Sequence, residues 1–211
     1  MSTTLYYSPS TASLVVHWLL IELGIPHELR ALDFDRCEQK SADYLKLNPA
    51  GVVPTLVLDG QAVTETAAIL MHLADLHPRA ELAPAPASAQ RAQYYRWMLF
   101  CANTLMPAYR AWFYPAEPAG EPNVEAARAQ ARQKIEAAWQ QVEDHLETHG
   151  PWLLGAQRTV ADFLLTMLMR WSRNMPRPTD TWPALHAHAQ RMKALSSFKE
   201  VYAREGLTDW T

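Results

Sequence analysis

The sequence predicts two structural units in one chain: a mixed α/β unit followed by an all-helical unit. Strand-like and helix-like segments alternate through residues 1–78, whereas residues 89–211 carry helical patterns and no strand pattern. Residues 79–88 are rich in Pro and Ala and have no helical period, which is typical of a linker between domains.

The first unit is expected to have the order β-α-β-α-β-β-α, so that a crossover helix joins its first two strands. Gly24 suits the position after the first helix, Asn48-Pro49 ends the second, and Asp59-Gly60 favours a tight primed turn. The expected segments are, in order, Thr4–Tyr7, Ser13–Leu23, His27–Leu32, Ser41–Leu47, Thr55–Leu58, Gln61–Val63 and Glu65–Leu76.

The second unit is expected to be a helical bundle. Three segments have the length and composition of long helices, and two shorter helices are expected after them. The expected helices are Gln90–Phe113, Asn123–Thr148, Val160–Arg173, Trp182–Leu195 and Ser197–Gly206. The second of these is strongly polar, with an apolar seam through Ile135, Trp139, Val142 and Leu146.

Composition excludes several classes of function. The 211 residues carry a formal charge of −3, which gives no electrostatic reason to expect nucleic acid or a membrane surface as partner. No apolar stretch reaches the roughly 18–20 residues that span a bilayer, and the N-terminal residues do not resemble a secretory signal. Cys37 and Cys101 fit a reducing compartment, so a cytoplasmic protein is expected. The eight histidines show no metal-binding spacing and are interpreted as solvated or capping residues, so no metal is expected.

Four segments resemble the cytosolic glutathione transferase family, in the order and spacing of that family: YYSPSTASLVVHWLLIELGIPHE, NPAGVVPTLVLDGQAVTETAAILMHLAD, PWLLGAQRTVADFLLTMLM and WPALHAHAQRMKALSSFKEVYAREGL. The resemblance covers nearly the whole chain, and bacterial members, including the beta class, look closest around Tyr94–Pro115. It implies a thioredoxin-like glutathione-binding domain before the helical domain, and a homodimer. It also implies conjugation of glutathione to a small hydrophobic electrophile, or reduction of a peroxide.

Val53 and Pro54 are candidates for holding the peptide part of such a ligand. Pro54 cannot donate a hydrogen bond, and an X–Pro bond can redirect the chain so that the N–H and C=O of Val53 point outward. The alternative is a plain turn before a strand. The resemblance implies a cis bond before Pro54 and pairing of Val53 with the cysteinyl unit of glutathione.

Glu65 and Thr66 are candidates for the γ-glutamyl end of glutathione. A helix N-terminus favours a carboxylate, the Thr66 hydroxyl adds a donor, and Glu65 can accept from an ammonium group. The alternative is ordinary helix capping by Thr64.

Ser10 and Tyr7 are the catalytic candidates. A thiol with a pKa near 8.5 is mostly protonated at neutral pH, and a nearby hydroxyl donor would stabilise the thiolate. The resemblance favours Ser10, with Tyr7 as the second choice, whereas Thr11 and Ser13 are expected to be capping residues. Beta-class members have a cysteine at the position of Ala12 and a histidine at that of Met106. Because this chain has alanine at position 12, mixed-disulfide chemistry there is excluded.

Other family positions leave alternatives open. Many members have Lys or Gln where this chain has Val52, so the glycyl carboxylate of glutathione needs another partner, for which Gln39 and Lys40 are suitably placed; Lys40 could equally be a solvated lysine. The expected electrophile contacts, each with core packing as its alternative, are Asn103, Met106, Tyr109, Arg110 and Trp112.

Thr159 and Asp162 resemble the family's internal capping box, a folding element.

Two alternative functions remain open. One is binding or regulation by a protein that keeps this fold without catalysis, and the other is glutathione-dependent isomerisation or dehalogenation.

Overall fold

The computed structural model describes residues 2–211 and divides into two compact units. The first unit runs to Ala83 and also takes in Lys193–Thr211, and the second is Pro84–Met192. Residues 193–211 were expected in the helical domain because they have a helical pattern and follow it in the chain. The structure groups them with the α/β unit instead, because α10 (Ser196–Glu205) packs against α1 (Ser13–Glu22).

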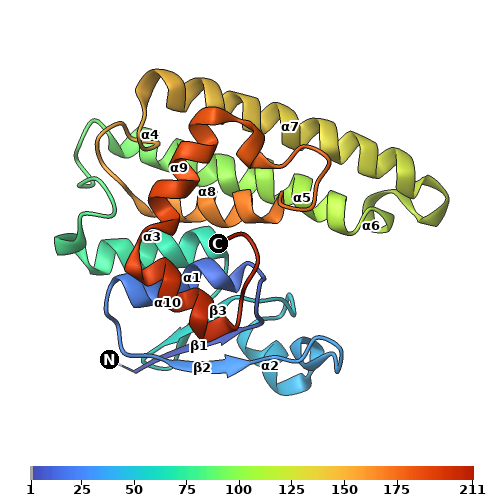
Figure 1. Ribbon diagram of the computed structural model, residues 1–211. Helices are drawn as coiled ribbons and strands as arrows, with labels where there is room; N and C mark the ends of the chain where they lie inside the picture. The colour runs from blue at the N-terminus through green and yellow to red at the C-terminus, as the bar shows by residue number, and fades with distance from the viewer. Residues whose placement is uncertain (1) are drawn as a thin grey trace. The chain divides into compact units, whose positions relative to one another are not determined.

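The first unit contains a four-stranded sheet in the order β2-β1-β3-β4 (Figure 1). Its strands are β1 (Thr3–Tyr7), β2 (Glu28–Ala31), β3 (Thr55–Leu58) and β4 (Gln61–Val63). β1 and β2 are parallel, which requires the crossover through α1, whereas β3 is antiparallel to both β1 and β4. The hairpin turn has positive φ at both Asp59 (45°) and Gly60 (82°), which confirms the primed turn.

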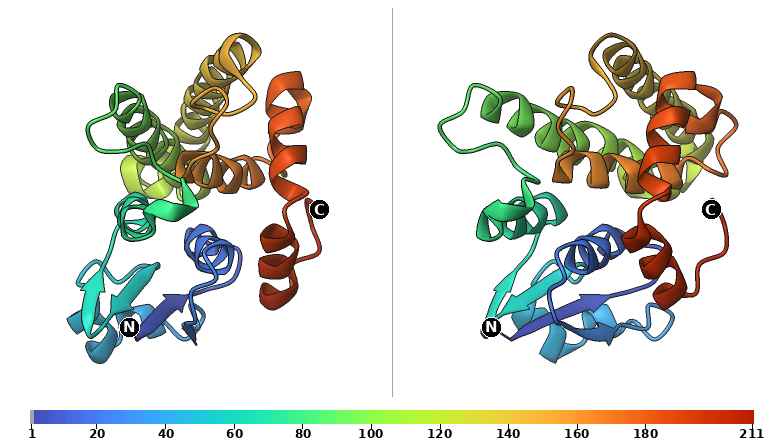
Figure 2. Two further views of the ribbon diagram at one scale, coloured as in Figure 1. Left: turned by 90° about the vertical axis from the view of Figure 1, so that its left-hand side faces the viewer. Right: turned by 60° about the vertical axis from the view of Figure 1, so that its left-hand side comes forward.

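The helices of this unit lie on both sides of the sheet (Figure 2). They are α1, α2 (Ala42–Leu47), α3 (Thr66–Leu76) and α10, with the short helices η1 (Glu38–Lys40) and η2 (Pro78–Ala80). Every residue of α1 from Ser13 to Leu20 is buried, because the helix contacts β1, α3 and α10. The predicted β-α-β-α-β-β-α order is confirmed.

The second unit is helical, as predicted. Its elements are α4 (Arg91–Phe100), η3 (Cys101–Leu105), α5 (Met106–Phe113), α6 (Ala116–Ala119), η4 (Glu121–Asn123), α7 (Val124–His149), α8 (Val160–Trp171), η5 (Thr179–Thr181) and α9 (Pro183–Lys193). The apolar seam of α7 is buried, and α8 is buried from Val160 to Arg170. Within residues 2–211, no helix is both long enough and apolar enough to cross a membrane.

The expected helix Gln90–Phe113 is helical throughout Arg91–Phe113, but it contains a π-helical turn that was not predicted. The segment η3 is a π-helical turn, in which the N–H of Met106 bonds the carbonyl of Cys101, five residues back. The following residue, Pro107, has no N–H, and its ring would clash with a carbonyl four residues earlier in a regular α-helix. The wider π turn accommodates that ring.

The capping box at the start of α8 is confirmed. The carboxylate of Asp162 accepts the Thr159 N–H at 2.8 Å and the Leu153 N–H at 2.9 Å. Burial raises the pKa of Asp162, because the low-dielectric interior disfavours its charge, although these donors and His188 oppose the effect. His188 is itself fully buried, as is His17, so the interpretation of all the histidines as solvated or capping residues was wrong for these two.

Candidate functional site

Strand register brings three of the predicted site segments to one end of the sheet. Tyr6 pairs with Thr55, and Leu56 pairs with Val63. Continuing both antiparallel registers outward places Tyr7 opposite Pro54, and Pro54 opposite Glu65. The loop containing Ser10 follows β1 at this same end, so residues far apart in sequence converge here.

Buried polar side chains hold the loop that leads into Val53. The Val52 carbonyl accepts hydrogen bonds from the Tyr44 hydroxyl at 2.6 Å and from the Asn48 Nδ2 at 2.8 Å. The Val53-Pro54 bond is cis, as the resemblance implied. Val53 lies outside the strands, and its backbone groups make no hydrogen bond with the rest of residues 2–211. They therefore remain available to an extended peptide ligand.

Gln39 and Lys40, in η1, lie against this loop. Lys40 Nζ donates to the carbonyl of Ala50 at 3.1 Å, and the Gln39 Oε1 is buried without a hydrogen-bond partner among residues 2–211. Gly51 allows the approach: its φ is +61°, and an added Cβ would come within 2.9 Å of the Gln39 carbonyl and 2.7 Å of Lys40 Nζ. Both candidates thus border the segment that presents Val53.

Glu65 is strained and exposed immediately before α3. Its φ is 67°, a left-handed value that costs on the order of 1–3 kcal/mol for a residue other than glycine. Thr66 begins the helix and is buried, and within the described residues no side chain caps this helix start. The alternative role of Thr64, capping the start of α3, is therefore not seen. The N–H groups of the first turn lack intrahelical acceptors, as at any helix N-terminus.

The turn after β1 uses several hydroxyls for its own structure. The Thr11 and Ser13 hydroxyls both donate to the Ser8 carbonyl, at 2.7 and 3.0 Å, and lie 2.8 Å from each other. The Ser8 N–H in turn donates to the Ser13 hydroxyl at 3.2 Å. These contacts give Thr11 and Ser13 a local structural role in the turn.

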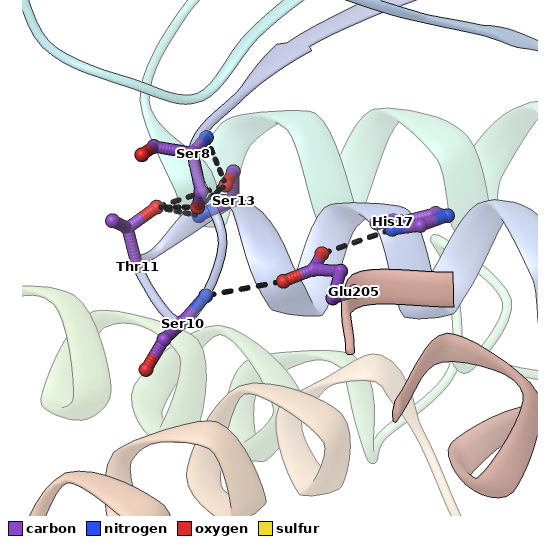
Figure 3. A network of polar contacts seen from close by, with 6 residues as sticks. All are labelled: Ser8, Ser10, Thr11, Ser13, His17 and Glu205. Atoms are coloured by element: carbon purple, nitrogen blue, oxygen red, sulfur yellow. Dashed lines mark hydrogen bonds and ion pairs between the residues drawn. The ribbon is translucent and has the colours of Figure 1, made fainter. Parts of the chain in front are cut away.

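The Ser10 hydroxyl points away from that cluster (Figure 3). Ser10 has a φ of 65°, and its N–H donates to the Glu205 Oε2 at 3.1 Å. A left-handed conformation costs about 1–2 kcal/mol, and a hydrogen bond to a charged group contributes about 1.5–3 kcal/mol. The bond to Glu205 is therefore strong enough to offset the strain at Ser10.

Glu205 is held in turn by His17. The Glu205 Oε1 lies 2.9 Å from the His17 Nδ1, and both side chains are fully inaccessible to solvent. Because an ionised carboxylate only accepts hydrogen bonds, the Nδ1 is the donor. Sequence reasoning missed both residues: Glu205 lies 195 positions from Ser10, and no local motif signals such a contact.

Tyr7, the second catalytic candidate, is partly buried at the end of β1. Burial raises the pKa of its hydroxyl, and the negative charge of Glu205 raises it further. The phenol is therefore protonated at neutral pH, which makes it a hydrogen-bond donor rather than a base.

The candidates for electrophile contact lie on η3 and α5 of the second unit. Tyr109 is fully buried and accepts a hydrogen bond from the Trp139 Nε1 at 3.1 Å, which favours its core-packing alternative. Arg110 is exposed and pairs with Glu117 at 2.5 Å. The other three are not fully buried: Asn103 is exposed, and Met106 and Trp112 are partly buried.

The first unit also contains a cavity of about 520 Å³ that is separate from these residues. Leu20, Ile21, His27, Glu200 and Arg204 contribute to its lining. These residues belong to the C-terminal half of α1, the segment after it, and α10, so the cavity is not part of the site at the end of the sheet.

Comparison with known proteins identifies both units. Residues 9–76 match the family model "Glutathione S-transferase, N-terminal domain", and residues 125–191 match "Glutathione S-transferase, C-terminal domain". The chain is 35% identical over 207 residues to glutathione S-transferase GST-4.5 of Xanthomonas campestris pv. campestris, covering 96% of this chain and 98% of that relative.

Two solved structures extend the likeness. A glutathione transferase of Methylococcus capsulatus str. Bath is 32% identical with a TM-score of 0.87, covering 98% of this chain and 100% of the other. A glutathione transferase homologue from Sulfitobacter, solved with bound glutathione, is 30% identical with a TM-score of 0.88, covering 98% and 99%. With both domain models and full-length relatives in agreement, this chain belongs to the glutathione S-transferase family.

Proposed function

We propose that this chain is a glutathione transferase that binds glutathione in its α/β unit and activates the thiol to attack a hydrophobic electrophile. The observation that carries the proposal is the convergence of Val53, Glu65 and the Ser10 loop at one end of the sheet. A peptide-binding edge, a helix N-terminus and a hydroxyl donor there match the three parts of glutathione that need recognition.

The binding roles follow from the chemistry of each group. The Val53 backbone pairs with the cysteinyl unit of the ligand, as an added strand would. The first turn of α3 and the Thr66 hydroxyl receive the γ-glutamyl carboxylate, and Glu65 accepts from the ammonium group on the same carbon. Gln39 and Lys40 lie beside the Val53 loop and are the candidates for the glycyl carboxylate.

The proposed chemistry requires a thiolate. Ser10 donates its hydroxyl proton in a hydrogen bond to the glutathione sulfur, which stabilises the anion after the thiol proton leaves to solvent. The sulfur then forms a bond to the electrophilic carbon, and the leaving group departs with its electron pair. Tyr7 remains the second candidate for the donor. Because position 12 is alanine, this site forms no mixed disulfide with glutathione there.

In the second unit, we propose Asn103, Met106 and Trp112 as the electrophile contacts, because their side chains are not fully buried. Arg110 is retained as a weaker candidate, since Glu117 already pairs with it. Tyr109 is kept only as a support for its neighbours.

We further propose that the chain forms a homodimer and works in the cytoplasm. Tyr95 (43% exposed) and Leu99 (51% exposed) lie one turn apart on α4 and present an apolar face to solvent. The two cysteines are unpaired thiols, which suits a reducing compartment.

The test of glutathione binding is thermal unfolding with and without glutathione, followed by assays with a panel of electrophiles and peroxides. At 100 times Kd, the ligand is expected to stabilise the native state by about 2.7 kcal/mol. Glu65→Gln is expected to remove most of that shift. Glu81→Gln is the matched control, because Glu81 is also an exposed acid with positive φ (55°) and lies outside the proposed site.

The outcomes separate the candidate functions. A shift in the wild type that Glu65→Gln abolishes, together with turnover of an electrophile, supports the transferase. A shift without turnover of any substrate supports a binding protein of the same fold. No shift at saturating glutathione would contradict the proposal.

A further inference from the structure

Glu205 connects the turn that carries Ser10 to the end of α10. Each carboxylate oxygen makes one contact: Oε2 with the Ser10 N–H at 3.1 Å, and Oε1 with the His17 Nδ1 at 2.9 Å (Figure 3). The Glu205 side chain is fully inaccessible to solvent. A buried acid that holds the backbone of a strained turn fixes the direction of the side chain at that position.

We propose that Glu205 is a positioning residue for thiolate formation: from α10 it holds the Ser10 backbone in the conformation that presents the Ser10 hydroxyl to the glutathione sulfur. The inference rests on the proposed function, in which that hydroxyl stabilises the thiolate. His17 supports the arrangement by fixing the second oxygen of the carboxylate.

A direct effect of the Glu205 charge on the pKa of the bound thiol would be opposite to the effect of positioning Ser10. A negative charge close to a thiolate repels it and raises the pKa of the thiol. Neutralising Glu205 would then lower the pKa of bound glutathione. If Glu205 acts by positioning Ser10, losing its hydrogen bond instead weakens the stabilisation of the thiolate and raises that pKa.

Docking of α10 does not depend on Glu205 alone. At the other end of this helix, the Trp18 Nε1 donates to the Ser197 hydroxyl at 2.9 Å, and Ser197 also bonds Glu22. Phe198 packs edge-on against Trp18, with ring centroids 5.1 Å apart. These contacts anchor α10 to α1, so variants of Glu205 have a framework that keeps the helix in place.

Two substitutions separate the hydrogen bonds from the charge. Glu205→Met keeps a similar volume and has no strong acceptor. Glu205→Gln also removes the charge, but its amide oxygen can accept from the Ser10 N–H while its NH₂ donates to the Nδ1 of the other neutral tautomer of His17. The measurement is the pKa of the thiol of enzyme-bound glutathione, followed by the ultraviolet absorbance of the thiolate.

Glu205→Met is expected to raise the pKa of the bound thiol by about one unit, which means about tenfold less thiolate below that pKa. Glu205→Gln is expected to leave the pKa close to the wild-type value. Affinity for S-methylglutathione, which has no ionisable thiol, should change little in both. In a Ser10→Ala background, Glu205→Met should produce no further shift, because the positioned hydroxyl is already gone.

Glu143→Met is the matched control. Glu143 is another buried acid that accepts two backbone hydrogen bonds, from Ala184 at 2.9 Å and Leu185 at 2.8 Å, but it belongs to the second unit. The same pKa shift in Glu143→Met would overturn the proposal, because the effect would then be one of general destabilisation.

A lowered pKa in Glu205→Gln, or an unchanged pKa in Glu205→Met, would also overturn it. If Glu205→Met does not fold, Glu205→Gln decides between the two roles: a pKa close to the wild-type value supports positioning, and a lowered pKa supports a direct effect of the charge. A wild-type protein that binds glutathione without any thiolate signal would instead contradict the proposed function itself.

Discussion

Ser10 is the residue on which the proposed chemistry depends most directly. Its backbone is left-handed, its N–H is bonded to Glu205, and its hydroxyl points away from the cluster formed by Ser8, Thr11 and Ser13. The Thr11 and Ser13 hydroxyls thus stabilise the turn, whereas the Ser10 hydroxyl points away from it.

Ser10→Ala is expected to lower turnover by at least about tenfold while glutathione affinity changes little, because a donor to the thiolate is lost and the binding groups remain. Steady-state kinetics with a reactive electrophile and a direct binding measurement check both parts. Ser8→Ala is the matched control, since it removes a neighbouring hydroxyl and keeps the Ser8 backbone contacts of the turn. If Tyr7→Phe lowers turnover and Ser10→Ala does not, the donor is Tyr7.

At the scale of single residues, some features of the candidate site could be predicted from the sequence and others could not. The cis bond before Pro54 was predictable because the family resemblance implied it. Tyr109 was a candidate for electrophile contact with core packing as its alternative, and only the folded chain shows that it is fully buried. Glu205 could not be predicted at all, since only the folded chain brings it to Ser10.

Among the elements, α4 carries two of the exposed large apolar side chains, Tyr95 and Leu99. Leu99→Glu is expected to convert the proposed homodimer into a monomer, because a charge placed at the centre of an apolar interface loses its hydration. Sedimentation would then give the 23.9 kDa of a single chain. Gln93→Glu adds the same group on another face of the helix and should leave the dimer intact. A wild-type protein that sediments as a monomer would contradict the proposal.

Element types were predictable to a greater extent than element details. Periodicity and turn residues identified all four strands and the long helices, and the capping box identified the start of α8. The π turn at Cys101–Leu105 was not predicted, because the sequence around Pro107 still has helical composition. Pro107 changes the hydrogen bonding of the helix backbone, and the pattern of apolar residues contains no information about that change.

For the molecule as a whole, partly and fully buried histidines make stability depend on pH. Burial lowers the pKa of His27, His145 and His188. The hydrogen bond to the Leu153 carbonyl opposes the shift at His145, and Asp162 opposes it at His188. Each histidine therefore binds its proton more readily in the unfolded chain, where the pKa is near 6.5. Their contribution is intact above that value and decreases as pH falls toward the lowered pKa values of the folded state.

The midpoint temperature of thermal unfolding is accordingly expected to decrease as the pH is lowered from about 7.5 to about 5.5. Each such histidine changes the free energy of unfolding by at most about 1.4 kcal/mol per pH unit. His188→Asn should make this dependence shallower, whatever its effect on absolute stability. His186→Gln, at an exposed position of the same helix, is the control and should leave the slope unchanged. A midpoint that is constant or rises on acidification would contradict the expectation.

The return of α10 to the first unit also has a consequence for biosynthesis. The ribosome makes the turn with Ser10 near the beginning of translation, but Glu205 emerges only after the entire helical unit has been made. Until then, His17 has no carboxylate partner and the strained turn at Ser10 lacks its support. The nascent α/β unit can form its sheet early, yet Ser10 gains its hydrogen bond to Glu205 only when the last helix docks, so on the proposal above thiol activation waits for the complete chain.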